Sequence, residues 1–361
     1  MNTAIALWLS QDAVMNGAIY ALLALGLIVV YTVTRVILVP QGEFISYAAL
    51  SLATLQAGAV PGTVYLLIIA GVSVALVDTI ALVRRSPNRG AASATSPRND
   101  ASGAIARILF WNVLVPLLVA AAAWSSASRR DLLVLQVLVT IAIVTPMGPM
   151  LYRLAFQPLA NASILVLLIV AVAVHYMMTG LGLVFFGGEG LRSQMFPGLT
   201  FQLGILSITG QSIAVVITAV VLILVLAVLF GRTLYGKALR ATAINRIGAR
   251  LVGISAEFSG RLAFTLAALI GAVSGILISP ITTIYYDTGF LISLKGFVGA
   301  IIGGMTSYPA AAIGAVMVAF LESFSSFWAS AFKESIVFTL IIPVLLWRSL
   351  TAQRIEEDEE P

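Results

Sequence analysis

The sequence contains no cysteine, a single histidine and few charged residues. Among its 361 residues, 10% are charged and 60% are hydrophobic. The absence of cysteine excludes a disulfide framework, an iron–sulfur cluster and a thiol nucleophile. His175, the one histidine, cannot supply the several ligands of a catalytic metal site, so we expect it to pack or to form a hydrogen bond. So low a charge content is not typical of a soluble domain, and it predicts a polytopic membrane protein.

Long apolar runs predict an all-α fold, a polytopic transmembrane helical bundle in which residues 1–361 form a single domain. We expect about 11 membrane segments, because a helix of about 20 apolar residues spans the bilayer and satisfies its own backbone hydrogen bonds. Ala267, Gly271 and Gly275 are spaced to form a close-packing face on one segment. The expected segments are Ala13–Val33, Phe44–Val60, Val64–Val83, Ile108–Trp124, Leu132–Leu151, Ile164–Phe186, Gln211–Phe230, Leu262–Ile281, Leu291–Met305, Pro309–Trp328 and Ser335–Trp347.

Basic residues concentrate in a few loops, and the longest of these is Gly231–Arg261. Its charged residues are Arg232, Lys237, Arg240, Arg246, Arg250 and Arg261 against the single acid Glu257. Positively charged loops stay on the cytoplasmic side of a membrane. Counting spans from this loop places the N-terminus outside and the C-terminus in the cytoplasm, with Arg129 and Arg130 as a basic pair in an outside loop. The net charge of +5 therefore indicates membrane topology rather than nucleic-acid binding.

Within Gly231–Arg261, apolar residues recur every four positions and predict a short amphipathic helix. The apolar stripe consists of Leu239, Ala243, Ile247 and Leu251. We expect Gly253 to end this helix and Ser255, with Glu257, to begin the next one. A cytosolic helix with an apolar stripe needs a partner that covers it. The alternative is an interfacial helix that lies on anionic lipid.

The same segment contains the string G-x-x-x-x-G-K, from Gly231 to Lys237, which is typical of phosphate-binding loops. Such a loop needs a serine or threonine next, to hold magnesium, and a β-strand before it. Here Ala238 follows and a membrane helix precedes. We therefore expect no nucleotide site, no bound cofactor and no metal in this chain.

The segment Leu291–Met305 is short for a span, at about fifteen residues, and it is rich in glycine. We expect a broken or re-entrant helix that packs inside the protein, because exposed backbone cannot face lipid. Near the N-terminus, Pro40–Glu43 joins the first two spans, and we expect it at the cytoplasmic boundary.

Five ionisable residues lie inside or beside the expected spans: Asp12, Glu43, Asp78, Lys295 and Glu322. A charge in the bilayer is costly unless it is paired or hydrated. Asp12 and Glu43 have an interfacial alternative, and Asp78 is close enough to Arg84 to reach the head groups. For Lys295 we predict an ion pair with Glu322 or Glu43 beside a central pathway.

Five stretches carry the motifs of one known family in that family's order. They are NGAIYALLALGL at Asn16–Leu27, QGEF at Gln41–Phe44, LYRLAFQPL at Leu151–Leu159, AINRIGARLVGI at Ala243–Ile254, and a C-terminal set at Lys295-Gly296-Phe297, Gly303-Gly304, Ser307, Gly314 and Glu322. Together they resemble the LivH-type permeases of ABC importers for branched-chain amino acids. The family usually has histidine, arginine and glutamate where this sequence has Gln41, Gln157 and Ile247.

This resemblance implies a permease subunit, not itself an enzyme, of an importer for small hydrophobic amino acids in a bacterial or archaeal plasma membrane. Besides the lipid bilayer, its partners would be a paralogous permease in a heterodimer, two cytoplasmic ATPases that use ATP and Mg²⁺, and an extracytoplasmic substrate-binding protein. The residues expected to couple to the ATPases are Ala243, Ile244, Asn245, Arg246, Ile247, Arg250, Leu251 and Gly253. Those expected beside the translocation pathway are Gln41, Glu43, Lys295 and Glu322.

Two parts of the sequence fall outside the resemblance. Residues 63–130 look like an insertion of two spans with a flexible loop, because Arg84–Arg107 is rich in Ser, Ala and Pro. We expect it to form a peripheral hairpin or a docking surface. The tail 354–361 is acidic and is expected to be disordered.

Other functions remain open at the level of sequence. Urea, short amides or small carboxylates are alternative substrates for the same kind of importer. An ATP-independent secondary transporter or channel could also use short, glycine-rich broken helices. An intramembrane enzyme is disfavoured, because the sequence has no cluster of acids, histidines or cysteines.

Overall fold

The computed structural model describes residues 3–85, 97–129, 132–194, 200–203, 206–305, 307–347 and 350. The expected acidic tail, 354–361, and residues 86–96 of the expected flexible loop lie outside these residues. The remainder of that loop is helical, since residues 97–107 belong to the helix Pro97–Leu109, so the expectation of a flexible loop is wrong there. Within the described ranges, nine helices are long and apolar enough to cross a membrane. The expected all-helical membrane bundle is confirmed. The nine are Thr3–Thr34, Thr63–Arg84, Gly103–Ala127, Leu133–Leu159, Ile164–Phe186, Gly210–Arg232, Ala256–Ile278, Tyr308–Trp328 and Ser330–Trp347.

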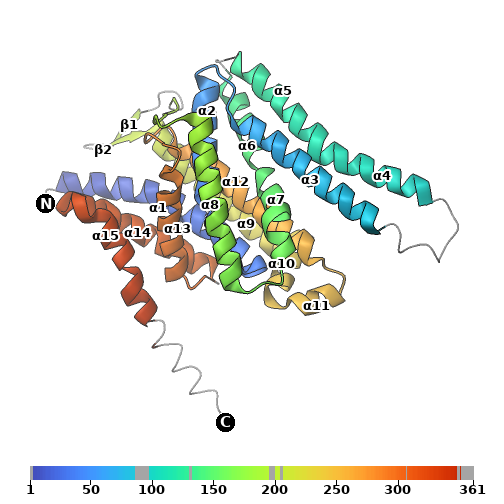
Figure 1. Cartoon of the computed structure of the whole chain (residues 1–361). Coiled ribbons are helices and arrows are strands. Elements are labelled where there is room, and N and C mark those ends of the chain that lie inside the picture. Colours follow the sequence, from blue (N-terminus) through green and yellow to red (C-terminus); the bar gives the residue numbers. More distant parts are fainter. Residues whose placement is uncertain are drawn as a thin grey trace, which may run out of the picture.

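Figure 1 labels the elements in chain order. The helices are α1 (Thr3–Thr34), α2 (Gln41–Gln56), α3 (Thr63–Arg85), α4 (Pro97–Leu109), α5 (Val115–Ala127), α6 (Leu133–Val144), α7 (Met147–Leu151), α8 (Ile164–Phe186), α9 (Gly210–Arg232), α10 (Leu234–Ile244), α11 (Arg246–Leu251), α12 (Ala256–Ile278), α13 (Thr288–Ile302), α14 (Tyr308–Trp328) and α15 (Lys333–Thr339). The helical part also includes two π-helical segments, Phe110–Leu114 and Tyr152–Phe156, and two short 3₁₀ turns, Gln157–Leu159 and Ser330–Phe332. Residues 341–347, after α15, are helical as well.

Each expected span overlaps a helix, but two of these helices are short. The short helix α13 was expected, and α2 was not: it has 16 residues and begins at Gln41, three positions before the expected Phe44–Val60. Gln41 and Glu43 form the first turn of α2 and are 0% and 1% exposed. Both side chains are therefore enclosed by neighbouring helices.

The centre of the bundle is α1, packed against α9, α12, α13 and α14, with α2 lying along α12. Small residues make the close approach of α2 and α12 possible. A side chain at Gly271 would meet Phe44, and one at Gly275 would collide with the carbonyl of Ile45. The close-packing face expected from Ala267, Gly271 and Gly275 is therefore confirmed, and α2 is its partner.

A two-stranded hairpin, which the sequence analysis did not anticipate, lies between α8 and α9. It consists of β1 (Thr200–Leu203) and β2 (Leu206–Thr209), paired antiparallel with Thr200 opposite Thr209. The preceding residue Leu191 also forms a bridge with Ile284, between α12 and α13. These connections lie at the end of the bundle opposite α10 and α11 (Figure 1). We call the end that carries Gly231–Arg261 the basic end.

Residues 63–127 contribute a pair of helical arms, α3 and α4–α5, that pack on each other and project from one side of the bundle (Figure 1). An ion pair ties them to the core: Arg153 Nε, in the π-helical segment after α7, lies 2.6 Å from Asp78 Oδ1 in α3. Both side chains are largely buried. An ion pair was one expectation for Asp78, with reach to the head groups as the alternative; the structure shows the ion pair, with a partner 75 positions away.

We predict that Asp78→Asn destabilises the protein, because Arg153 would keep its charge in a largely buried site without its carboxylate. The expected loss is about 1–3 kcal/mol, which a thermal unfolding assay of the detergent-purified chain would detect. Glu189→Gln, at an exposed acid between α8 and β1, is the matched control and should leave the melting temperature unchanged. Equal melting temperatures for Asp78→Asn and wild type would show that the pair contributes nothing.

Candidate functional site

A lysine, a glutamate and a tyrosine from three helices meet inside the bundle. Lys295 Nζ of α13 lies 2.5 Å from Glu322 Oε1 of α14. The hydroxyl of Tyr20, in α1, donates a hydrogen bond of 2.7 Å to Glu322 Oε2, and the ammonium group lies 5.9 Å from the centre of the same ring. Both carboxylate oxygens therefore have partners. We call Tyr20, Lys295 and Glu322 the lysine cluster.

The lysine cluster confirms one expected ion pair and excludes the other. Lys295 pairs with Glu322, and Glu43 has a different partner. The side chains of Lys295 and Glu322 are 8% and 14% exposed, so each charge would be costly if the other were removed. Because α1, α13 and α14 each supply one member, the cluster joins the three helices at the centre of the bundle.

Glu43 pairs with the single histidine. His175 Nδ1, in α8, lies 2.6 Å from Glu43 Oε1, and the hydroxyl of Thr179 donates to the same oxygen at 3.4 Å. The imidazole ring also packs on Phe290 of α13, with ring centres 4.3 Å apart. The expected hydrogen-bonding role of His175 is thus confirmed. Its partner lies 132 positions away, and no local pattern could have identified it.

The first turn of α2 is enclosed by the neighbouring helices. Gln41 Nε2 donates to the carbonyl of Ala267 in α12 at 3.1 Å. At Gly42 the backbones of α2 and α13 touch, because a side chain there would collide with the carbonyl of Gly289. Two buried oxygens in this turn, Gln41 Oε1 and Glu43 Oε2, have no hydrogen-bond partner among the described residues. We call Gln41, Glu43 and His175 the α2 cluster.

The four residues expected beside a pathway thus fall into two groups. Gln41 and Glu43 share the first turn of α2, while Lys295 and Glu322 belong to the lysine cluster. No hydrogen bond or ion pair between described residues joins the two groups. They are linked through α13, which carries Lys295 and also packs its Gly289 and Phe290 on the α2 cluster.

The expected amphipathic helix at the basic end is broken. Residues 234–251 form α10 and α11, separated at Asn245, whose backbone is extended (φ −147°, ψ 103°). The side-chain oxygen of Asn245 accepts a hydrogen bond of 2.9 Å from the amide of Gly248. Asparagine favours such caps over helix interiors, because its side chain competes for the backbone amides. A continuous helix through Leu239 and Leu251 is therefore wrong.

The break divides the expected apolar stripe between the interior and the surface. Leu239 is buried in the bundle. Four apolar residues around α11 are instead turned outward: the exposed fractions are 86% for Ile244, 74% for Ile247, 83% for Leu251 and 76% for Val252. We call these four residues the α11 apolar surface. The expected end of the segment is confirmed, since Gly253 has φ +87° and the hydroxyl of Ser255 accepts from the amide of Phe258.

Arg246 fastens this surface to the bundle. Its Nε and Nη2 donate to the carbonyl of Val33 at 3.1 and 2.6 Å, and Nη1 donates to the carbonyl of Ala160 at 3.4 Å. Val33 lies in the last turn of α1, where carbonyls lack helical partners. Burial lowers the pKa of the Arg246 guanidinium below its usual value. The start of α11 is thereby held to α1 and to the segment that precedes α8.

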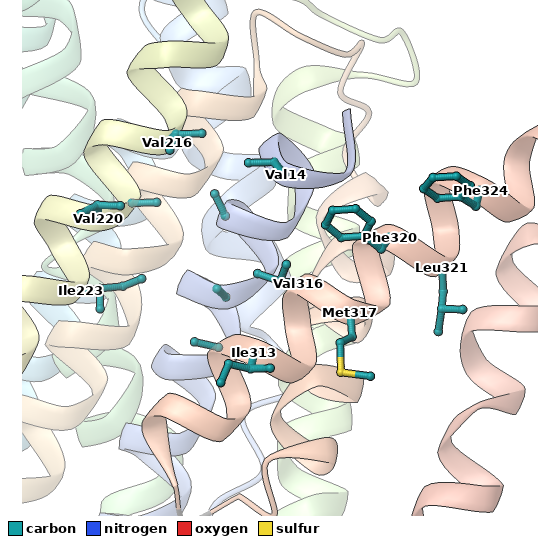
Figure 2. A pocket seen from close by; sticks show the side chains of 14 residues that line it. Val14, Val216, Val220, Ile223, Ile313, Val316, Met317, Phe320, Leu321 and Phe324 are labelled. Atoms are coloured by element: carbon teal, nitrogen blue, oxygen red, sulfur yellow. The ribbon is translucent and has the colours of Figure 1, made fainter. Parts of the chain in front are cut away.

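A wide apolar groove of about 790 Å³ lies between α1, α9 and α14. Figure 2 shows Val14, Val220 and Phe320 among the side chains that line it. All of its lining residues are apolar. A zwitterion such as a free amino acid needs partners for an ammonium and a carboxylate group, so this groove is unsuited to bind one. It suits an acyl chain or another helix.

No group of three or more His, Cys, Asp or Glu side chains is placed to hold a metal ion in the described part of the chain. The string from Gly231 to Lys237 is equally unsuited to phosphates. It passes from the end of α9 into α10, and a side chain at Gly236 would collide with the carbonyl of Leu229. Its backbone is therefore packed in a tight helical turn and forms no open cradle.

Comparisons with known proteins agree with this architecture. Residues 11–346 match a family model described as the branched-chain amino acid transport system permease component. The high-affinity branched-chain amino acid transport system permease protein LivH of Escherichia coli K12 is 28% identical over 217 residues, which cover 57% of this chain and 69% of LivH. The corresponding permease protein BraD of Pseudomonas aeruginosa is 27% identical over 58% of this chain and 70% of its own. No solved structure matches the chain.

We predict that the lysine cluster stabilises the fold as a pair. Glu322→Gln should lower the melting temperature, because it leaves the Lys295 ammonium buried without a counter-charge, at a cost of about 3 kcal/mol. The double variant Lys295→Met/Glu322→Gln should recover much of the loss. Tyr20→Phe should cost about 1 kcal/mol, since it removes one hydrogen bond to a charged group.

Lys237→Met, at an exposed lysine of α10, is the matched control for loss of a positive charge. Thermal unfolding and size-exclusion chromatography of the purified variants measure these effects. If the loss of stability in the double variant equalled the sum of the losses in the two single variants, Lys295→Met and Glu322→Gln, the pairing would be contradicted.

Proposed function

The chain belongs to the family of branched-chain amino acid transport permeases, and on this premise we propose that it is the permease subunit of an ABC importer for small hydrophobic amino acids. The family match extends over residues 11–346, almost the whole bundle. Permeases of this family have no catalytic site of their own. The observation that carries the proposal is the α11 apolar surface, because exposed apolar residues in a basic segment need a protein that covers them.

The partner proposed for the α11 apolar surface is an ATPase subunit. Covering a large aliphatic side chain contributes roughly 1.5–3 kcal/mol, so the four exposed residues offer a compact anchor. A short helix that docks in a groove and moves with it can transmit a conformational change. The proposed coupling residues are the eight expected from the sequence: Ala243, Ile244, Asn245, Arg246, Ile247, Arg250, Leu251 and Gly253.

Arg246 connects the α11 apolar surface to a helix of the bundle. Its guanidinium holds the Val33 carbonyl, near the end of α1. The same helix carries Tyr20 of the lysine cluster. A movement of α11 would therefore act on α1 and, through Tyr20, on the contacts of α1 with α13 and α14. In this proposal the ATPase displaces α1 without any direct contact between its nucleotide and the permease.

The proposed translocation pathway runs beside the lysine cluster and the α2 cluster. Its residues are Gln41, Glu43, Lys295 and Glu322. These groups support the proposal because Glu43, Lys295 and Glu322 are charged side chains held inside an apolar bundle, on or beside the short helices α2 and α13. Their partners in the resting protein are Tyr20 and His175, so a substrate would compete with existing pairs for a carboxylate or an ammonium group.

The remaining subunits are proposed from the family and from the charge pattern. A paralogous permease would complete the pathway as a heterodimer, two ATPases would use ATP and Mg²⁺, and an extracytoplasmic binding protein would deliver the substrate. The chain would bind no cofactor itself. In a bacterial or archaeal plasma membrane the basic end would face the cytoplasm, with the N-terminus outside and the C-terminus inside. Residues 63–130 would form a peripheral insertion.

We predict that Ile247→Asp releases the ATPase subunits and abolishes transport, because a carboxylate on the α11 apolar surface cannot be buried in an apolar groove without a large cost. Copurification of the ATPases and uptake of labelled leucine measure the two effects. Ile247→Met, which keeps an apolar side chain of similar volume, should retain both. If Ile247→Asp left copurification and uptake unchanged, the proposal that α11 contacts the ATPase would be contradicted.

A second prediction concerns energy coupling and the substrate. Proteoliposomes that contain this chain with its partner permease, ATPases and binding protein should accumulate leucine, isoleucine or valine only when ATP is supplied. The chain alone should give no uptake. If urea, short amides or small carboxylates accumulated instead, the proposal of an ATP-driven importer would stand, and its proposed substrate would be replaced. Uptake by the isolated chain without ATP would establish a secondary transporter or channel.

A further inference from the structure

A small cavity of about 270 Å³ opens where the helical arms of residues 63–127 meet the core at the basic end. Val74 of α3 and Trp111 line one side, and Arg153 and Arg261 line the other. Asn112 also reaches it. Its chemistry differs from that of the apolar groove in Figure 2, because two arginines, an asparagine and a tryptophan line it together with apolar residues.

Both π-helical segments of the described residues border this cavity. One of them, Phe110–Leu114, contains Trp111 and Asn112, and the other, Tyr152–Phe156, contains Arg153. A π segment adds a residue to a helical turn and changes the direction in which the following side chains point, and such segments are frequent at functional sites. The first also touches α3 backbone to backbone, because a side chain at Gly71 would collide with the carbonyl of Asn112.

The two arginines of the cavity differ in their partners. Arg153 is neutralised by Asp78 at 2.6 Å. Arg261 has no carboxylate within ion-pair distance among the described residues, and its terminal nitrogen reaches only the amide oxygen of Gln157, at 3.5 Å. Its Nε is buried and has no hydrogen-bond partner there. The cavity therefore holds a positive charge with unused donors, which is suited to an anion.

The position of the cavity indicates which anion would reach it. Arg261 lies five residues into α12, or about 8 Å from its start, which is the depth of lipid head groups for a helix that begins at the membrane surface. Trp111 is 62% exposed, and tryptophan favours this interfacial level. Above it, Leu114 and Leu118 present exposed apolar side chains along the same arm. A phosphate at Arg261 could thus continue into acyl chains.

We infer that this cavity is a binding site for an anionic phospholipid of the leaflet at the basic end. The phosphate group accepts hydrogen bonds from Arg261, and the acyl chains of the lipid lie along Leu114 and Leu118. Basic pockets between membrane helices recognise acidic head groups in this way. The lipid compensates the charge of Arg261 and fills the space between the helical arms and the core.

The test measures lipid binding to the full-length purified chain by native mass spectrometry. Phosphatidylglycerol and phosphatidylcholine with identical acyl chains are titrated in turn, and inorganic phosphate is added as a competitor. Wild type should bind phosphatidylglycerol about fivefold more tightly than phosphatidylcholine, the preference that one basic side chain gives. Arg261→Gln should lose this preference, whereas Arg261→Lys, which keeps the charge, should retain part of it.

Arg107→Gln is the matched control, because Arg107 is an exposed arginine in the last turn of α4 and does not line the cavity. It should keep the wild-type preference. An equal loss in Arg107→Gln would indicate a general charge effect and overturn the site, as would an unchanged preference in Arg261→Gln. Displacement of the lipid by millimolar phosphate would assign the cavity to a free anion and overturn the lipid proposal.

A second measurement does not depend on the folding of the variants. Wild-type protein is irradiated with phosphatidylglycerol that carries a photoactivatable head group, and the labelled peptides are identified. Labelling should occur in the peptides that contain Trp111 and Arg261. Labelling confined to other regions, such as the groove of Figure 2, would contradict the inference.

Discussion

A charge inside an apolar helical bundle needs a partner within the protein, because lipid supplies none. This requirement organises the structure through three buried pairs among the described residues: the ion pair Lys295–Glu322, the hydrogen-bonded pair Glu43–His175, and the ion pair Asp78–Arg153. Each pair joins different elements. The first connects α13 with α14, the second α2 with α8, and the third connects the helical arm α3 with the core. The pairs thereby fix the positions of these helices relative to one another, which contacts with lipid would not do.

The pairs can form only because small residues let the backbones approach. Gly42 of α2 lies against Gly289 of α13, and Gly271 of α12 leaves room for Phe44. The short helices α2 and α13 therefore meet deep in the bundle, and the polar first turn of α2 is buried there. Short or interrupted helices are tolerated in membranes where protein covers their ends. Here they bring the polar side chains to the centre.

The two ends of this arrangement have different surfaces, and the proposed mechanism depends on the contrast. Inside the membrane region, the groove between α1, α9 and α14 is apolar and can be covered by lipid or by another helix. At the basic end, Ile247 and its neighbours are apolar in a segment rich in arginine, where water would be the alternative to a partner. Arg246 connects this exposed surface to the last turn of α1. One helix thus carries contacts with the proposed ATPase interface and with the lysine cluster.

The sequence by itself determined the properties that depend on neighbouring residues. Hydropathy predicted the membrane segments, the cap at Ser255 and the turn at Gly253 followed from local backbone chemistry, and the length of Leu291–Met305 predicted the short helix α13. The tertiary structure alone decided the partners of Glu43 and Asp78, which lie 132 and 75 positions away. The break at Asn245 depends on a local cap, which the apolar periodicity by itself did not reveal. The reason is physical: hydropathy and capping act within a few residues, whereas the pairing of buried charges depends on which helices pack together.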